Sequence, residues 1–464
     1  MIMRLKGSIT AWVCLTMFLV CQVILVFIEG ARKCEIERAK QLETDRNLES
    51  VFAGYVKPLW DRYHILSWDE TKMDYSQIEA ESRNFSKQEA KHDLLEAALD
   101  ETDWQRMLIT DQEGLAYQKL IASYRGKYWT YSSIDRPRSE CEKIEALEKE
   151  SKGSLEYYTK DIRGDVMDGS IKLMSQIVSD GIFQYAMLGD TVTLSKNEID
   201  KDSCLKERNL KRGDIGINGS LSLVEKALFM DYVYTTFGNF RKVNKDAALQ
   251  YEQEYLLCGY ENDYENLLAV SNRLFVIRIA ANLISLHQDQ QKMNQAESYA
   301  EVLAALCMEP ELAEVFKPMI VTSWAMAESV LDLRSLLQGD KLPIIKTSEE
   351  WTTSQYLLCE YYILSGQKAK SSTRGMAYED YLKALLLTVS NENLAYRAMD
   401  MQEKSIQQLS GYEDFKMDNL VVAVKMECAY KANYWLLPKI KFLSNKTKDG
   451  YMVYCYSEYS YLNK

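Results

Sequence analysis

The sequence predicts a mostly helical α+β protein that begins with one membrane-spanning helix. Three observations support this prediction. An uncharged apolar run covers Ile9–Ile28. Apolar residues then recur at helical spacing through most of the chain, whereas two segments near the C-terminus are β-branched and aromatic with a period near two. We therefore expect a helical body with a small antiparallel sheet that includes the C-terminal strands.

The apolar run has the length of a transmembrane helix. Its twenty residues, at 1.5 Å each, extend over about 30 Å, which is the hydrocarbon thickness of a bilayer. The run is longer than the apolar core of a secretory signal, and Glu29-Gly-Ala-Arg32 after it lacks the small residues of a cleavage site. We interpret Ile9–Ile28 as a single span that stays in the chain, with the lipid bilayer as its partner.

Charge bias leaves the orientation of this span open. The basic residues near it are Arg4 and Lys6 before it and Arg32, Lys33, Arg38 and Lys40 after it. The positive-inside tendency would then place the large C-terminal part in the cytoplasm. Three glutamates are interleaved with the later group, however, and long domains translocate largely regardless of charge.

Composition excludes some classes of protein. The chain is 47% hydrophobic and 27% charged, which is ordinary for a globular protein and sufficient for more than one core. The net charge of −12 offers no broad basic face, so we expect no nucleic-acid partner. The ten cysteines contain no C-x-x-C pair, and we expect buried free thiols instead of a zinc site or a disulfide framework.

Residues 29–135 are predicted to form a membrane-proximal helical region. Residues 32–56 are rich in helix-forming charged residues, and an apolar stripe develops only from Leu48 and Phe52 onward. We expect one long helix that is solvated just outside the bilayer, lifts the domain clear of it, and ends or bends at Pro58. Residues 86–125 are predicted to be helical as well.

Residues 136–220 are predicted to be a loop-rich linker region. Residues 139–170 are polar and weakly periodic, and Gly213, Gly216 and Gly219 lie close together in the loop-rich stretch 195–220. The spacing of these glycines does not fit a dinucleotide-binding loop, and no apolar strand precedes them.

Residues 221–464 are predicted to be an α+β domain. The predicted helices are 227–240, 270–284, a helix starting at Pro318, and 378–388; the predicted strands are 249–260, 419–430 and 451–461. Arg273 and Arg278 interrupt the apolar helix 270–284, so we expect a soluble core helix there and not a second span. The last two strands should pair antiparallel, and tyrosines on both faces of the last one indicate an edge strand, either ordinary or open to pairing.

No catalytic, cofactor-binding or metal-ligating residue can be assigned. The three histidines are His64, His92 and His287. Glu89-x-x-His92 matches half of a di-iron motif, but the second copy is absent, which favours a solvated helix face. The signatures G-x-S-x-G, H-E-x-x-H and the P-loop do not occur.

The sequons at Asn84, Asn218 and Asn445 are interpreted as chance matches. The carboxylates Glu140, Glu142, Glu145, Glu148 and Glu150 are interpreted as a solvated helix face.

Several short motifs give the chain a family resemblance. They are Lys6-Gly-Ser-Ile-Thr10, Glu29-Gly-Ala-Arg32, Tyr55-Val-Lys-Pro-Leu-Trp-Asp-Arg-Tyr63, Glu254-Tyr-Leu-Leu-Cys-Gly259, Ala325-Met-Ala-Glu-Ser-Val-Leu-Asp-Leu-Arg334 and Gly375-Met-Ala-Tyr-Glu-Asp-Tyr-Leu382. Through them the chain resembles an uncharacterised family of single-pass membrane proteins of Gram-positive anaerobes that is associated with tight-adherence (Tad/Flp) pilus loci. The resemblance implies an anchor with an exported domain, similar to a minor pseudopilin, and supplies no catalytic residues.

The chain departs from the pilin pattern at one position. Type IV pilins are cleaved after a glycine and carry a glutamate five positions on, but counting from Gly7 that position is Trp12. Processing at Gly7 is therefore not expected. The resemblance implies that residues 1–8 are cytoplasmic and that the C-terminal domain lies outside the cytoplasmic membrane.

The sequence therefore leads us to expect a non-enzymatic, membrane-anchored component of a Tad/Flp-type pilus or its assembly apparatus, with pilus subunits or assembly proteins as partners and no small-molecule substrate. A membrane-anchored sensor that binds a ligand through its acidic, tyrosine-rich domain is the first alternative. An extracytoplasmic hydrolase is the second, and it predicts a deep pocket with converging polar groups.

Overall fold

The computed structural model describes residues 5–72, 97–127, 142–149, 169–188, 193–217, 219–435 and 450–463. The chain divides into two compact units. Unit 1 comprises Met1–Tyr124, Leu210–Leu221 and Lys416–Lys464, and unit 2 comprises Arg125–Asn209 and Ser222–Phe415. Helices dominate the described residues and the strands form one small antiparallel sheet, which confirms the predicted α+β class.

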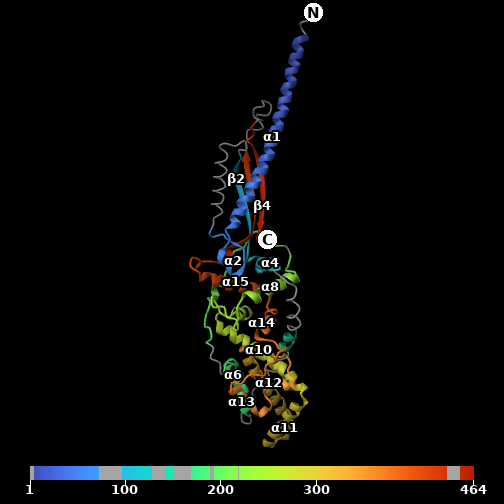
Figure 1. The fold of residues 1–464 in the computed structure, drawn as a ribbon, viewed down its shortest axis with the longest axis vertical. Coiled ribbons are helices and arrows are strands. Elements are labelled where there is room, and N and C mark those ends of the chain that lie inside the picture. Colours follow the sequence, from blue (N-terminus) through green and yellow to red (C-terminus); the bar gives the residue numbers. More distant parts are fainter. Residues whose placement is uncertain are drawn as a thin grey trace. The chain divides into compact units, whose positions relative to one another are not determined.

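Unit 1 is built on α1 (Leu5–Ala53), a single continuous helix (Figure 1). Its apolar first part is long and apolar enough to cross a membrane, and none of that part is buried against the protein. The helix ends at Ala53, and Pro58 lies in the first turn of the next helix, α2 (Lys57–Tyr63). The predicted long helix and its end near Pro58 are confirmed.

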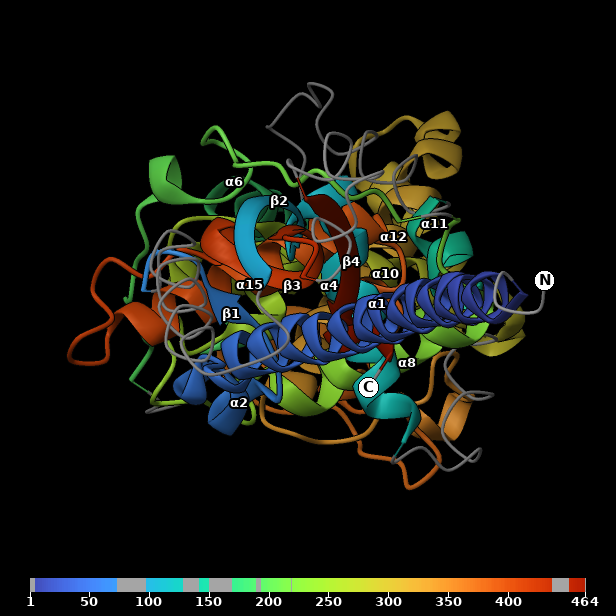
Figure 2. The same cartoon turned by 90° about the horizontal axis from the view of Figure 1, so that it is seen from above.

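The second part of α1 packs on the sheet and is not solvated as predicted. Figure 1 and Figure 2 both show α1 running alongside β4 (Tyr451–Ser460). One face of α1 is buried at Glu29, Arg32, Ile36, Lys40, Thr44, Leu48 and Phe52, a spacing of three to four residues. The prediction was wrong because the first buried positions after the span are charged residues, whose burial depends on partners elsewhere in the chain.

The sheet has β3 (Leu420–Ala432) as its central strand. β2 (Ala97–Leu108) pairs with β3 along one edge, while β1 (Trp68–Asp69) and β4 pair with successive parts of its other edge. All pairings are antiparallel, so the predicted C-terminal pair is confirmed. The hydroxyl oxygens of Thr44 and Tyr430 lie 3.1 Å apart, which identifies the face of β3 that α1 covers.

Two predicted elements were wrong. Residues 86–125 were expected to be helical, but β2 occupies Ala97–Leu108 and only α4 (Asp111–Gly126) is helical there. β2 is stabilised by β3, which lies more than 300 residues later in the sequence, so local periodicity carried no signal of it. Residues 249–260 were expected to be a strand but form α9 (Glu252–Cys258), in which nearly all side chains are buried and periodicity is uninformative.

Unit 2 is organised around α10 (Asp263–Gln288) and α12 (Ala313–Leu337), which pack against each other. α11 (Gln290–Leu306) packs on α12, and α9 packs on α10. Among the described residues, unit 2 also contains a helix at 142–149, α6 (Gly169–Asp180), α7 (Phe183–Ala186), α8 (Leu223–Thr236), α13 (Cys359–Leu364), α14 (Tyr378–Leu386) and α15 (Asn391–Gln407). Single 3-10 turns of unit 2 occur at Lys201–Ser203, Pro310–Leu312, Ser348–Glu350 and Tyr356–Leu358, and those of unit 1 at Met417–Asn419 and Tyr461–Asn463.

The predicted helices at 227–240, 270–284 and 378–388 are confirmed as α8, α10 and α14. α10 is also long and apolar enough for a span, but 61% of its most apolar window is buried inside the protein, as expected of a core helix. α12 begins at Ala313, five residues before the predicted start, and contains Pro318 in its second turn.

The predicted linker region 136–220 contains α6, α7 and a helix at 142–149 among its described residues, followed by the largely irregular stretch 193–217. Gly213 in this stretch approaches other main chain closely. Its N–H donates to Asp111 Oδ1 at 3.0 Å, and a Cβ there would lie 2.6 Å from the Arg106 carbonyl oxygen. The glycine is therefore explained by packing within unit 1.

Candidate functional site

The first candidate site is the point where the apolar part of α1 meets the sheet. The Arg32 guanidinium donates to Glu29 Oε1 at 2.9 Å and to the Asn433 carbonyl oxygen at 2.8 Å. The main-chain N–H of Trp435 donates to both Glu29 carboxylate oxygens at 3.2 Å. We call Glu29, Arg32, Asn433 and Trp435 the junction. It fixes the end of β3 to α1 one residue after the apolar run ends.

α1 also covers the free edge of β4. The Gln41 side-chain amide donates to the Tyr456 carbonyl oxygen at 2.7 Å and accepts from the Tyr456 N–H at 3.3 Å. Lys40 pairs with Glu43 at 2.5 Å, and its ammonium lies 5.4 Å from the centre of the Tyr430 ring. β4 is the edge strand predicted from the tyrosines, and the Gln41 side chain forms hydrogen bonds with the outward-facing N–H and carbonyl of Tyr456.

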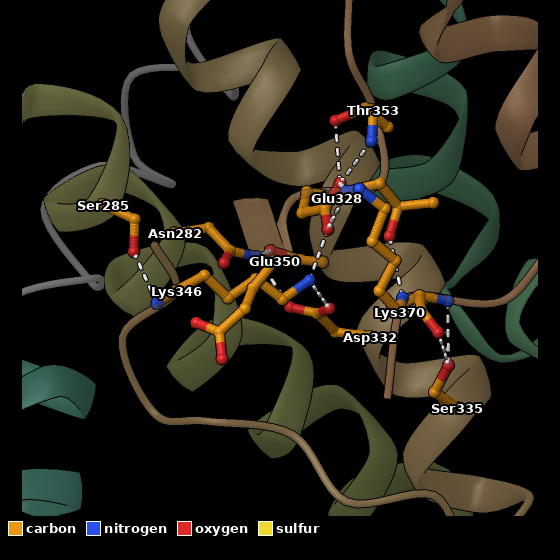
Figure 3. Close-up of polar contacts among 12 residues, drawn as sticks. Asn282, Ser285, Glu328, Asp332, Ser335, Lys346, Glu350, Thr353 and Lys370 are labelled. Atoms are coloured by element: carbon orange, nitrogen blue, oxygen red, sulfur yellow. Dashed lines mark hydrogen bonds and ion pairs between the residues drawn. The ribbon is translucent and has the colours of Figure 1, made fainter. Parts of the chain in front are cut away.

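The second candidate site is a charge cluster in the core of unit 2, formed by Arg278, Glu328, Asp332 and Lys346. Figure 3 shows three of these residues, Glu328, Asp332 and Lys346. All four side chains are 0% exposed. Arg278 Nε donates to Asp332 Oδ2 at 2.9 Å, and the Lys346 ammonium pairs with both Asp332 and Glu328. Two cations thus balance two anions between α10, α12 and the segment that follows α12.

Neutral donors and acceptors complete this charge cluster. The Thr353 N–H and hydroxyl donate to Glu328 at 2.9 and 2.8 Å, and the Asn282 amide donates to Asp332 at 2.8 Å. Burial alone would raise the pKa of Asp332, but Arg278 and Lys346 hold that pKa below its ordinary value. Burial likewise disfavours charged Lys346, but the Asp332 and Glu328 carboxylates raise its pKa. The charged forms of Asp332 and Lys346 are therefore favoured inside this enclosed cluster.

A pair of buried carboxyl groups opens α9. Glu252 accepts from the Gly238 N–H at 2.7 Å and Glu254 from the Phe240 N–H at 2.8 Å, while the Tyr378 hydroxyl donates to Glu254 at 2.7 Å. Burial raises the pKa of both carboxyls to about 7. The second oxygen of each carboxyl has no hydrogen-bond partner among the described residues.

A related group lies on α15. The Asp400 carboxyl accepts from the Leu205 N–H at 2.8 Å, and burial raises its pKa to about 6. Glu403 accepts two hydrogen bonds from the Arg208 guanidinium at 2.6 and 2.7 Å. Buried acids in unit 2 therefore repeatedly satisfy the main chain of loops, which is a structural use of charge.

The described surface carries open depressions of modest size. One of about 470 Å³ lies along α11 and is lined by Gln291, Asn294, Gln295, Ser298, Tyr299 and Val302. Another, of about 380 Å³, lies on the sheet and is lined by Asp103, Gln105, Lys425, Met426, Glu427, Tyr456, Ser457 and Glu458. Within the described ranges no group of three His, Cys, Asp or Glu side chains is placed to hold a metal ion.

The residues considered from sequence occupy separate places. His64 ends α2 and stacks on Tyr124 at 5.1 Å, and the exposed ring of His287 bonds the Leu283 carbonyl oxygen within α10. Glu148, expected to be solvated, accepts the Arg273 guanidinium at 2.9 Å. Glu89, His92, Asn84, Asn218 and Asn445 lie outside the described residues, as do Glu140 and Glu150.

The nine described cysteines are free thiols, but only four of them are buried as predicted. Cys204, Cys359, Cys428 and Cys455 are buried, whereas Cys14, Cys21 and Cys34 on α1 are exposed. Cys428 and Cys455 lie opposite each other across β3 and β4, and burial raises the pKa of each thiol to about 11. Both are therefore poor nucleophiles at neutral pH.

Sequence reasoning missed the residues that matter most in these sites. Glu29, Arg32 and Lys40 were counted as solvated charges, although their spacing continues the stripe of Ile36, Thr44 and Leu48. Arg278 was recognised as an interruption of an apolar helix, which was a usable signal of a buried ion pair. Its partners Asp332 and Lys346 follow 54 and 68 residues later, and no local pattern connects them.

The fold defines a class: α+β proteins whose first helix is apolar over one part and covers an antiparallel sheet with the other. The chain belongs to a family of unknown function, DUF5702, whose family model matches residues 163–432. That match includes the charge cluster, the α9 carboxyls and β3, and it excludes α1 and β4. Comparisons with curated proteins and with solved structures gave no match.

We predict that Lys346→Met destabilises the protein by about 3–5 kcal/mol, because it leaves two buried carboxylates facing one cation. Urea unfolding of the detergent-solubilised full chain measures this difference. Lys368→Met is the matched control, since Lys368 forms an exposed pair with Asp340 at 3.7 Å and should change stability by less than about 1 kcal/mol. Equal effects of the two substitutions would contradict a structural role for the cluster.

We predict that Glu254→Gln raises the free energy of unfolding relative to wild type, and that it does so by more at pH 8 than at pH 5. The folded chain holds the Glu254 proton more tightly than the unfolded chain does, with a pKa of about 7 against 4.5. This carboxyl therefore contributes stability below about pH 4.5 and loses it as the pH rises through 7. The neutral amide removes that loss, which is on the order of 1–3 kcal/mol.

Thermal unfolding of wild type and Glu254→Gln at both pH values measures the effect. The exposed Glu349→Gln serves as control for a change of charge alone. A difference between Glu254→Gln and wild type that is the same at pH 5 and pH 8 would show that Glu254 is ionised throughout.

Proposed function

We propose that the protein is a non-enzymatic, membrane-anchored component of a Tad/Flp-type pilus or of its assembly apparatus. In this proposal Ile9–Ile28 crosses the membrane, the N-terminus is cytoplasmic and the remaining chain is extracytoplasmic. The observation that carries it is the continuity of α1. The same helix offers an exposed apolar surface in its first part and supports the sheet with its second.

This construction suits a subunit that is held or moved through its membrane helix. A force on the apolar part of α1 acts on the sheet through hydrogen bonds at Glu29, Arg32 and Gln41 and through packing at Ile36 and Leu48. No flexible tether intervenes, because α1 has no break between the two parts. A minor pseudopilin, which the N-terminus resembles, would need such a rigid link between membrane and domain.

The proposal assigns binding to protein surfaces and not to a catalytic pocket. The buried acids described above are used by loops and ion pairs of unit 2 itself. Tyr454 and Tyr456 are 58% and 63% exposed on β4, and exposed tyrosines are common in protein interfaces. We expect pilus subunits or assembly proteins to bind this side of the sheet.

The anchor is tested by Leu19→Arg, which places a charge inside the apolar run at a cost of about 3 kcal/mol. We expect a larger share of this variant to be released from membranes by alkaline extraction. Leu42→Arg is the control, because Leu19 and Leu42 are similarly exposed on the same helix, at 52% and 54%. Equal extraction of both variants would argue against a span at Ile9–Ile28.

The partner class is tested by photo-cross-linking in cells from position 456, with protease added outside intact protoplasts to establish sidedness. The proposal expects pilus subunits or assembly proteins among the cross-linked products and cleavage of the domain by external protease. A signalling protein as the dominant product would favour the sensor alternative. Protection of the domain in sealed protoplasts would contradict a pilus role.

A further inference from the structure

The region beside the junction carries aromatic and basic side chains at the level where the apolar run ends. The Tyr434 and Tyr451 rings lie 5.0 Å apart, and the Lys33 ammonium lies 5.7 Å from the centre of the Tyr451 ring. Trp435 is 48% exposed. We call Lys33, Tyr434, Trp435 and Tyr451 the sheet tip.

The depth of the sheet tip follows from its bonds to α1. Ile28 is the last residue of the apolar run, and the Trp435 N–H is bonded to the very next residue, Glu29. Arg32, which holds the Asn433 carbonyl, lies four residues beyond Ile28, or about 6 Å along the helix axis. The headgroup layer of a bilayer is about 5–8 Å thick on each side. The sheet tip therefore lies within that layer whenever Ile9–Ile28 occupies the hydrocarbon.

The chemistry of the sheet tip fits this layer. Tryptophan and tyrosine are enriched at membrane interfaces because their rings are apolar while their N–H and O–H groups bond water and headgroups. The aliphatic parts of lysine and arginine side chains can also lie in the lipid layer while their charged groups reach the headgroups. Glu29 would be unfavourable here as a free charge, but it is 3% exposed and bonded to Arg32 and Trp435.

We propose that the sheet tip is a second membrane contact: Trp435, with Tyr434 and Tyr451, inserts into the interfacial lipid layer beside the span. This inference rests on the proposed membrane anchor and extends it. The protein then touches the bilayer through two elements, α1 and the end of the sheet, and unit 1 stands directly on the membrane instead of on a solvated stalk. Two contacts restrict tilting of the sheet, which a lone helix would leave free.

The experiment is quenching of tryptophan fluorescence by brominated lipid. The full-length protein is reconstituted into unilamellar phosphatidylcholine vesicles with bromine near the upper end of the acyl chains, and unbrominated vesicles give the reference. Three variants are compared: Trp435→Phe, Trp12→Phe and Trp60→Phe. Phenylalanine keeps an apolar ring at position 435, and the hydrogen bond from the main-chain N–H of that residue to Glu29 stays in place.

We expect Trp435→Phe and Trp12→Phe each to lose about half of the quenchable fluorescence, because Trp12 lies near one end of the span and Trp435 near the other. Trp60→Phe should lose none. Trp60 lies in α2, beyond the end of α1 at Ala53, which is about 37 Å along the helix axis from Ile28.

The outcomes separate the contact from the anchor. Quenching that depends on Trp12 but not on Trp435 overturns the sheet-tip contact and leaves the anchor intact. Quenching that depends on neither residue overturns both. Quenching lost with Trp60 would place α2 at the membrane and would also contradict the arrangement proposed here.

Discussion

Unit 1 depends on one unbroken helix whose two parts need different surroundings. The first part of α1 is apolar all round and fits hydrocarbon, whereas the second part has a single buried face that fits the sheet. The change occurs within one turn, at Glu29 and Arg32. Their charges are buried but paired, and main-chain groups of Asn433 and Trp435 supply the remaining hydrogen bonds. The sheet is therefore held against the helix at the point where the apolar surface stops.

Unit 2 also buries paired charges, and it uses buried carboxyl groups to accept main-chain N–H groups of its loops. Its central helices, α10 and α12, carry Arg278, Glu328 and Asp332 at fully buried positions, and Lys346 from the following segment completes a neutral set. Elsewhere Glu252, Glu254 and Asp400 accept main-chain N–H groups of loops that no helix or strand satisfies. Irregular segments are thereby fixed in position, and the match to DUF5702 covers this part of the chain.

Much of the fold could be predicted from local sequence. The span-length apolar helix, its long continuation, α10, α14 and the strands β3 and β4 all have strong periodicity or length, and they were predicted correctly. β2 and α9 were assigned the wrong type. β2 is charged and pairs with a strand more than 300 residues away, while α9 is buried on nearly every side and shows no contrast between faces. The charge cluster was visible only as an arginine in an apolar helix.

By itself, the sequence determined that Ile9–Ile28 forms an uncharged apolar helix of span length, because twenty uncharged apolar residues leave few other structures. It also determined the helical character of most of the rest. Only the tertiary structure decided that Glu29, Arg32 and Lys40 face protein and not water, and that the C-terminal strands join the N-terminal helix in one unit. The reason is physical: burial of a charge depends on partners brought near by folding, and those partners lie about 400 residues away along the chain.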